Sequence, residues 1–120
     1  PDEKLLASVK AEIDAQNTCG ANLIPGKLGR DVEAMGRAIM AKAGYGENFM
    51  YSGLHSVGVI EFEPPILGPS SDTVIEENMV ISVDIPLHEA DILGSRTEDG
   101  YIVTANGPVR LTTMPHLIFK

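Results

Sequence analysis

The chain is poor in cysteine, in basic residues and in long apolar runs. Its one cysteine, Cys19, cannot form an internal disulfide, whereas small secreted domains usually carry several. No apolar run approaches the ~20 residues of a membrane span, and no signal-peptide pattern is present. These absences predict a cytoplasmic protein with no membrane partner, in which Cys19 is a buried residue and not a catalytic thiol.

Lysine and arginine together number 9, against 17 aspartate and glutamate residues, which gives a formal net charge of −8. Nucleic-acid binding needs stripes of basic side chains to meet the phosphates, and none occurs here. We therefore expect no nucleic-acid partner. With 43% hydrophobic and 22% charged residues over 120 positions, the rest of the composition is that of one small globular domain.

Two helices are predicted in the N-terminal part of the chain. The first covers residues 2–19, with Asp2 suited to its first turn and Gly20 to its end. A Pro25-Gly26 turn separates it from a second helix over residues 28–43. The expected apolar faces are Leu5, Leu6, Val9 and Ile13 in the first helix and Val32, Met35, Ile39 and Ala43 in the second, with Gly36 close to the latter face.

The remainder of the chain has the pattern of strands. Short strands are expected over residues 49–51 and 56–62, with loops around Pro64-Pro65 and over residues 68–71. The strongest strand covers residues 79–85, where Met79, Ile81, Val83 and Ile85 share one face and Val80, Ser82 and Asp84 the other. Asn106-Gly107 predicts a hairpin between residues 101–105 and 109–113. The order of two helices followed by several strands predicts an α+β fold, with the helices packed on a curved antiparallel sheet.

Three separate segments each offer one metal-binding side chain near a strand end. They are residues 53–58 with His55, residues 82–86 with Asp84, and residues 96–100 with Glu98. One imidazole and two carboxylates suit Mn, Co, Fe or Zn, and two carboxylates can bridge a pair of such ions. Each also has a structural interpretation: a histidine beside a glycine, a solvated strand carboxylate, and a surface ion pair of Arg96 with Glu98.

These segments, in this order and spacing, resemble the C-terminal half of the catalytic domain of the M24 family. That family includes Xaa-Pro aminopeptidases, prolidases, methionine aminopeptidases and creatinases. The similar stretches are Ile24-Pro25-Gly26 with Asp31 and Arg37, residues 53–58, Glu63-Pro64, residues 78–84 and residues 96–99. The resemblance implies a pita-bread fold, a divalent metal pair, and cleavage of peptide substrates by metal-activated water, as in an Xaa-Pro aminopeptidase or dipeptidase.

The resemblance also implies roles for individual residues. His55, Asp84 and Glu98 are the expected metal ligands, with Asp84 standing where the family has a glutamate. Tyr51 and Phe62 occupy places where proline-directed members carry histidines that bind substrate and stabilise the tetrahedral intermediate; Tyr51 can still donate a hydrogen bond and Phe62 cannot. The expected catalytic residues are His55, Glu63 and Tyr51, with Glu63 assisting proton transfer, and the expected substrate contacts are Arg96 and Phe62.

Family peptidases take two further aspartate ligands from a strand pair that precedes this region. Asp2, Asp14 and Asp31 all lie in predicted helices, so one copy of this chain is not expected to complete a pair of metal sites. The chain also begins at Pro1, without a methionine. We expect residues 1–120 to be a fragment, the C-terminal half of the catalytic domain, with little or no peptidase activity alone and a tendency to form a homodimer.

Two other functions are compatible with the same residues. In a creatinase-like hydrolase without metal, His55 would act as general acid and base on a C–N bond, and Asp84 and Glu98 would bind a cationic substrate. The loss of both substrate histidines favours this alternative. A non-catalytic binding or assembly module is the second alternative, and the presence of His55 and Glu98 argues against it.

Overall fold

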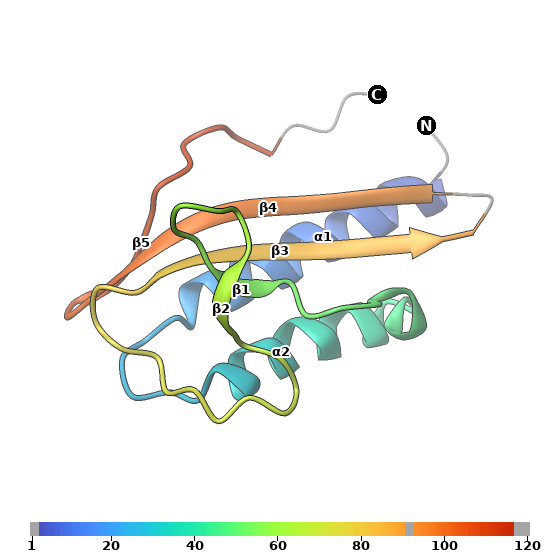
Figure 1. Cartoon of the computed structure of the whole chain (residues 1–120). Helices are drawn as coiled ribbons and strands as arrows, with labels where there is room; N and C mark the ends of the chain where they lie inside the picture. The colour runs from blue at the N-terminus through green and yellow to red at the C-terminus, as the bar shows by residue number, and fades with distance from the viewer. Residues whose placement is uncertain (1–2, 91–92, 117–120) are drawn as a thin grey trace.

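The computed structural model describes residues 3–90 and 93–116, which form two helices packed on one face of a five-stranded antiparallel sheet (Figure 1). The helices are α1 (Glu3–Ala21) and α2 (Gly29–Lys42), and a 3₁₀ turn, η1 (Gly46–Asn48), follows α2. The strands are β1 (Leu54–Ser56), β2 (Glu63–Ile66), β3 (Val80–Glu89), β4 (Leu93–Thr104) and β5 (Gly107–Arg110), in the spatial order β2-β1-β3-β4-β5. The predicted α+β class is confirmed.

The long hairpin of β3 and β4 forms the centre of the sheet. Residues of β3 alternate as predicted, because Ile81, Val83 and Ile85 are buried beneath the helices while Ser82 and Asp84 point to the opposite face. The structure extends β3 to Glu89 and pairs it with β4 from Leu93 onward, a part of the hairpin that the sequence did not predict. The Asn106-Gly107 turn is confirmed, and Gly107 has the positive φ of +111° that favours glycine there.

The predictions for residues 49–71 are partly wrong. Residues 49–51 form no strand, and the strand expected over residues 56–62 is instead β1, which ends at Ser56. Pro64-Pro65 lies in β2 and not in a loop. Proline is acceptable there because β2 is an edge strand with β1 as its one neighbour, so its outward amides need no ladder partner.

Helix α1 is where predicted, but its buried face is not the predicted one. Leu5, Leu6, Val9 and Ile13 are only partly buried. The buried residues of α1 are small or polar and comprise Ser8, Ala11, Glu12, Ala15, Gln16, Cys19 and Gly20. The helix ends at Ala21, one residue past the glycine expected to end it. Gly20 also allows close packing, since an added Cβ would lie 2.3 Å from Cζ of Tyr101 on β4. Asp2 lies outside the described residues.

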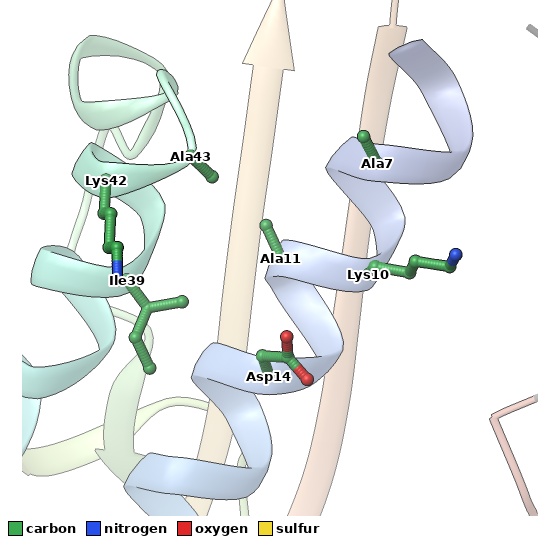
Figure 2. Close-up of a pocket in the computed structure, with 7 residues that line it drawn as sticks. All are labelled: Ala7, Lys10, Ala11, Asp14, Ile39, Lys42 and Ala43. Carbon is green, nitrogen blue, oxygen red and sulfur yellow. The ribbon is translucent and has the colours of Figure 1, made fainter. Parts of the chain in front are cut away.

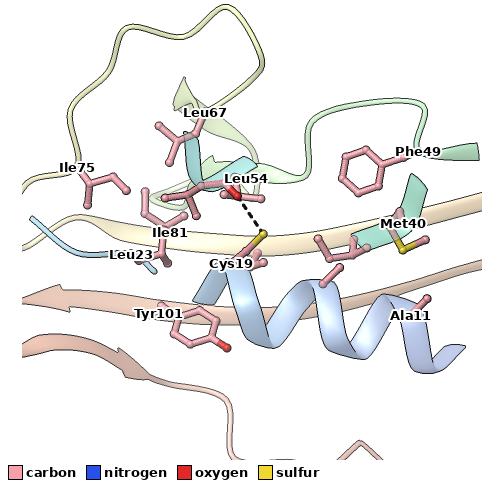
Figure 3. Close-up of a cluster of buried hydrophobic side chains, with 14 of the residues drawn as sticks. Ala11, Cys19, Leu23, Met40, Phe49, Leu54, Leu67, Ile75, Ile81 and Tyr101 are labelled. Atoms are coloured by element: carbon pink, nitrogen blue, oxygen red, sulfur yellow. Dashed lines mark hydrogen bonds between the residues drawn. The ribbon is translucent and has the colours of Figure 1, made fainter. Parts of the chain in front are cut away.

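Helix α2 has the predicted bounds to within a residue and sits close to α1. Val32 is buried as expected, but Met35 and Ile39 are half-buried and Ala43 is exposed, while Met40 fills the core. Gly36 allows the close approach, since an added Cβ would lie 2.6 Å from the Cys19 sulfur. Figure 3 shows Cys19 among the core side chains, where its thiol donates a hydrogen bond to the Val32 carbonyl. Burial raises the pKa of this thiol to about 12, so it is protonated and unreactive.

None of the helices in the described part of the chain combines the length and the apolar character that crossing a bilayer requires.

Candidate metal site

His55 lies on β1 with one ring nitrogen already occupied. Its Nδ1 is 3.1 Å from the Ser56 carbonyl oxygen, and only a protonated nitrogen can bond to a carbonyl. This contact leaves the Nε2 lone pair available to a metal. The imidazole is 1% exposed, and the ring of Phe62 covers it with 4.1 Å between ring centroids. The ring is therefore held in one orientation.

Strand register brings two carboxylates to the same place. In the β-ladder, His55 is opposite Ser82, and Asp84 is opposite Glu98. Directly opposed residues of an antiparallel pair share a face, so the side chains of all four lie on the face away from the helices. Ligand atoms of His55, Asp84 and Glu98 all lie within 4.8 Å of one another. Among the described residues, these three form the group of histidine and acidic side chains that could hold a metal ion.

The electrostatics of Asp84 suit a bound cation. Asp84 is 3% exposed, and its Oδ1 atom is buried without a hydrogen-bond partner among the described residues. Burial raises the pKa of this carboxyl and the nearby Glu98 carboxylate raises it further, while Arg96 and His55 act in the opposite direction. A divalent cation would provide the missing partner and offset the repulsion between the two carboxylates. The residues present therefore fit a divalent metal ion.

Two polar side chains border Asp84 from the solvent side. The Tyr51 hydroxyl donates a long hydrogen bond of 3.4 Å to Asp84 Oδ2. The Arg96 guanidinium lies 3.4 Å from Asp84, 3.4 Å from Glu98 and 3.6 Å from Glu61. Half of the Arg96 side chain is exposed, so these contacts contribute little stability and leave the guanidinium within reach of a ligand. Tyr51 and Arg96 thus contact Asp84, and Phe62 contacts His55. Their roles toward a substrate stay a prediction.

Glu63 is the remaining predicted site residue, and its carboxylate contacts the β1–β2 loop. Its Oε1 atom accepts a hydrogen bond from the Ile60 backbone amide, and its carboxylate lies so close to Gly58 that an added Cβ there would be 2.1 Å away. One further polar neighbour was not predicted: the Ser82 hydroxyl donates a 2.7 Å hydrogen bond to Glu98 Oε1. The alternation of β3 placed Ser82 on the face of Asp84, and that pattern was the signal available in the sequence.

Residues 1–105 match the sequence profile of metallopeptidase family M24. The chain belongs to this family. An M24 relative, the Xaa-Pro dipeptidase of Pyrococcus horikoshii, is 34% identical over 112 residues, which are 93% of this chain and 32% of that protein. The M24 resemblance proposed from the ordered segments is confirmed.

Solved structures agree with this membership. The Xaa-Pro dipeptidase from Bacillus anthracis matches with a TM-score of 0.93 and 33% identity, over 98% of this chain and 33% of that one. The prolidase from Pyrococcus horikoshii OT3 matches with a TM-score of 0.91 and 33% identity, over 96% of this chain and 33% of that one. The predicted pita-bread fold is confirmed, and the M24 chain spans about a third of the length of the relatives it matches.

One concavity of this M24 chain lies away from these residues. A groove of about 540 Å³ lies between α1 and α2, on the helical layer and not on the face that carries His55 (Figure 2). It is lined by Ala7, Lys10, Ala11, Asp14, Ile39, Lys42 and Ala43. The groove contains no group of side chains that could bind a metal, so the chemistry of the described residues is concentrated around His55, Asp84 and Glu98.

Proposed function

We propose that this chain contributes His55, Asp84 and Glu98 as ligands to the metal site of a hydrolase that cleaves peptide bonds, of the Xaa-Pro dipeptidase or aminopeptidase type. The observation that carries the proposal is the convergence of these three side chains, with the Asp84 Oδ1 atom buried and unpartnered. The names of the M24 relatives support the substrate class. In this proposal the chain corresponds to the C-terminal half of the catalytic domain.

The metal ligands and Tyr51 would have different roles in hydrolysis. A bound divalent metal, of which Mn, Co, Zn and Fe all suit the ligands, would polarise the scissile carbonyl and activate water. His55 would offer Nε2 because the Ser56 carbonyl holds Nδ1. Tyr51 would donate a hydrogen bond to the developing oxyanion, since its hydroxyl lies beside Asp84.

The remaining predicted residues would contact the substrate or move a proton. Arg96 has an exposed guanidinium that suits a substrate carboxylate, and Phe62 would present an apolar surface beside His55.

Glu63 would assist proton transfer. The variant Glu63→Gln tests that role, because the amide oxygen can still accept the Ile60 hydrogen bond while proton uptake is lost. A fall in kcat at unchanged thermal stability supports it.

The proposal also covers the location of the protein, its partners and the activity of the isolated chain. A chain with one buried cysteine and no helix suited to a bilayer among its described residues is consistent with the cytoplasm, and its acidic composition argues against nucleic acid as a partner. A homodimer is proposed for the isolated chain. Full peptidase activity is proposed for the full-length gene product and little or none for residues 1–120.

Metal binding by the 120-residue chain is the first test. Isothermal titration with Mn²⁺ or Co²⁺ should show one site that His55→Ala, Asp84→Asn and Glu98→Gln each weaken by at least about tenfold, because each removes a ligand atom. His88→Ala is the matched control, since His88 is exposed and outside the group. Binding that survives all three substitutions would refute the proposed ligand set.

Hydrolysis by the full-length gene product is the second test. Xaa-Pro dipeptides should be cleaved in the presence of Mn²⁺ or Co²⁺, and the three ligand variants should lose activity. Metal analysis of active protein separates this function from the metal-free creatinase-like alternative, which the loss of both substrate histidines, at Tyr51 and Phe62, favours. Active enzyme that contains no transition metal would support that alternative instead.

A further inference from the structure

Asp99 follows the proposed ligand Glu98 in the chain, and its side chain points to the opposite face of β4. It is 3% exposed. Four side-chain donors from three segments bond to its carboxylate. They are Gln16 Nε2 on α1 at 2.6 Å, Arg110 Nη2 on β5 at 2.8 Å, His116 Nε2 in the C-terminal segment at 2.8 Å, and the Thr112 hydroxyl. One buried carboxylate thus joins a helix, a strand and a terminal segment directly behind Glu98.

The part of β4 that carries Glu98 has weak support from the sheet itself. All residues of β3 pair with β4, over residues 93–102 of β4. In contrast, β5 pairs only with Tyr101–Thr104 of β4. On the side away from β3, the backbone hydrogen bond seen among the described residues before Tyr101 is the one from the Leu111 amide to the Gly100 carbonyl. Within the part of the chain that the structure describes, residues 93–99 therefore have β3 as their one strand neighbour, and the bonds to Asp99 provide the restraint that a second neighbour would give.

We propose that Asp99 is a positioning residue that fixes the place of the Glu98 carboxylate in the metal site. The proposal rests on the function proposed above. Adjacent residues of a strand move together, so a shift of Asp99 toward solvent would displace Glu98 from His55 and Asp84. Metal ligands tolerate displacements of only about 0.5 Å before affinity falls. Asp99 acts through Glu98 and does not touch the metal.

The chemistry of the contacts predicts a graded series of variants. The carboxylate accepts from all four donors, and Oδ2 alone accepts from Gln16, Arg110 and His116. Asp99→Asn keeps the shape but removes the charge that Arg110 faces, and Asp99→Ala removes every acceptor. Thr112→Val removes one donor and keeps the volume. We expect the loss of metal affinity to be largest in Asp99→Ala, smaller in Asp99→Asn and smallest in Thr112→Val.

Co²⁺ binding by the 120-residue chain tests the proposal, with affinity and the visible absorption spectrum as readouts. Asp99→Ala should weaken Co²⁺ binding by about 10- to 100-fold and alter the absorption bands, because changes behind a ligand disturb its geometry. Asp99→Asn should show a smaller effect of the same kind, which keeps the test valid if the alanine variant fails to fold. Ser95→Ala is the matched control, since it breaks the contact of Ser95 with Glu12 on the same face of β4 without touching Asp99.

Two outcomes would overturn the proposal. One is Co²⁺ affinity and spectrum unchanged in both Asp99 variants; the other is an equal loss in Ser95→Ala, which would show a general effect of stability. If the wild-type chain binds no Co²⁺, the proposed function fails, and a crystal structure of Asp99→Asn then decides about Asp99. Glu98 should lose its 2.7 Å hydrogen bond from Ser82 in that structure, and a retained bond would refute the positioning role.

Discussion

At the scale of single residues, the fold buries the acidic side chains of Asp84, Asp99 and Glu12 to 3% exposure or less. His55, Asp84 and Glu98 could be named because their residue types bind metals and each lies in a stretch that resembles a known family motif. Asp99 and Glu12 could not, because an acidic residue is expected on the surface unless a tertiary partner is known. Their partners, Gln16 for Asp99 and Ser95 for Glu12, are distant in sequence.

Glu12 provides a prediction about pH. It is fully buried in α1, one of its carboxylate oxygens has no partner among the described residues, and burial raises its pKa from 4.5 to about 6. Below pH 4.5 the group is protonated in the folded and unfolded states alike, so it has no effect. Between the two values only the unfolded chain loses the proton, and the folded state is therefore destabilised progressively as pH rises.

Glu12→Gln should remove this penalty. Glutamine keeps an oxygen for the Ser95 hydroxyl and carries no charge, so the free energy of unfolding above pH 6 should rise by about 1–2 kcal/mol over the wild type. Below pH 4.5 the two proteins should be equally stable. Urea unfolding on either side of the window measures this, with Glu3→Gln at an exposed position of α1 as the control. A constant difference across the window would show that Glu12 does not titrate as described.

At the scale of helices and strands, the bounds of the helices were predicted well, and the helix faces and the strand bounds less so. Residues 28–43 were predicted as a helix and α2 spans Gly29–Lys42, because glycines and a Pro-Gly turn mark its ends. The predicted buried face of α1 was wrong, because the residues it buries include Ser8, Glu12 and Gln16, which no hydrophobic pattern can indicate. β2 was missed because two consecutive prolines indicate a loop unless the strand is known to lie at an edge.

The α1–α2 contact leads to a prediction about packing. Gly36→Ala should destabilise the protein by about 1–3 kcal/mol, since the new methyl group would lie 2.6 Å from the Cys19 sulfur. The next neighbour, Ile85, would be at an ordinary 3.7 Å. Removal of the sulfur should therefore relieve the clash, and Gly36→Ala in a Cys19→Ala background should cost little.

Thermal or urea unfolding of the four proteins in this double-mutant cycle gives the coupling energy. We expect the double variant to be more stable than the sum of the single effects predicts, by about 1–2 kcal/mol. Gly100→Ala is a suitable control, because no atom lies within 4 Å of the Cβ it would add. Strictly additive effects would mean that the helices separate and the glycine is not required for their approach.

At the scale of the whole molecule, the sequence predicted the fold class but not the sheet order. Helices followed by strands indicate an α+β fold, and Asn106-Gly107 indicates the last hairpin. The pairing of β1 with β3, which brings His55 beside Asp84, joins segments separated by β2 and a long loop. Local patterns carry no information about such pairings, so only the order of the family motifs suggested that the three ligands converge.

The surface of the molecule predicts self-association of the isolated chain. Apolar side chains of the β1–β2 loop are exposed, with Val59 at 101% and Ile60 at 61%, and β4 has no second strand neighbour before Tyr101 among the described residues. Exposed apolar groups and open strand edges favour pairing with another copy. The net charge of −8 opposes it. Association should therefore increase with protein concentration and also with salt, which screens the repulsion.

Analytical ultracentrifugation of the 120-residue chain at low and high salt measures this balance. Replacement of both Val59 and Ile60 by aspartate should shift the equilibrium toward monomer by removing apolar contact and adding repulsion. Val109→Asp is the control, because Val109 is also exposed, at 49%, but lies on β5 away from that loop. A monomer that persists at high concentration and high salt would show that these exposed surfaces do not drive association, and it would refute the homodimer prediction.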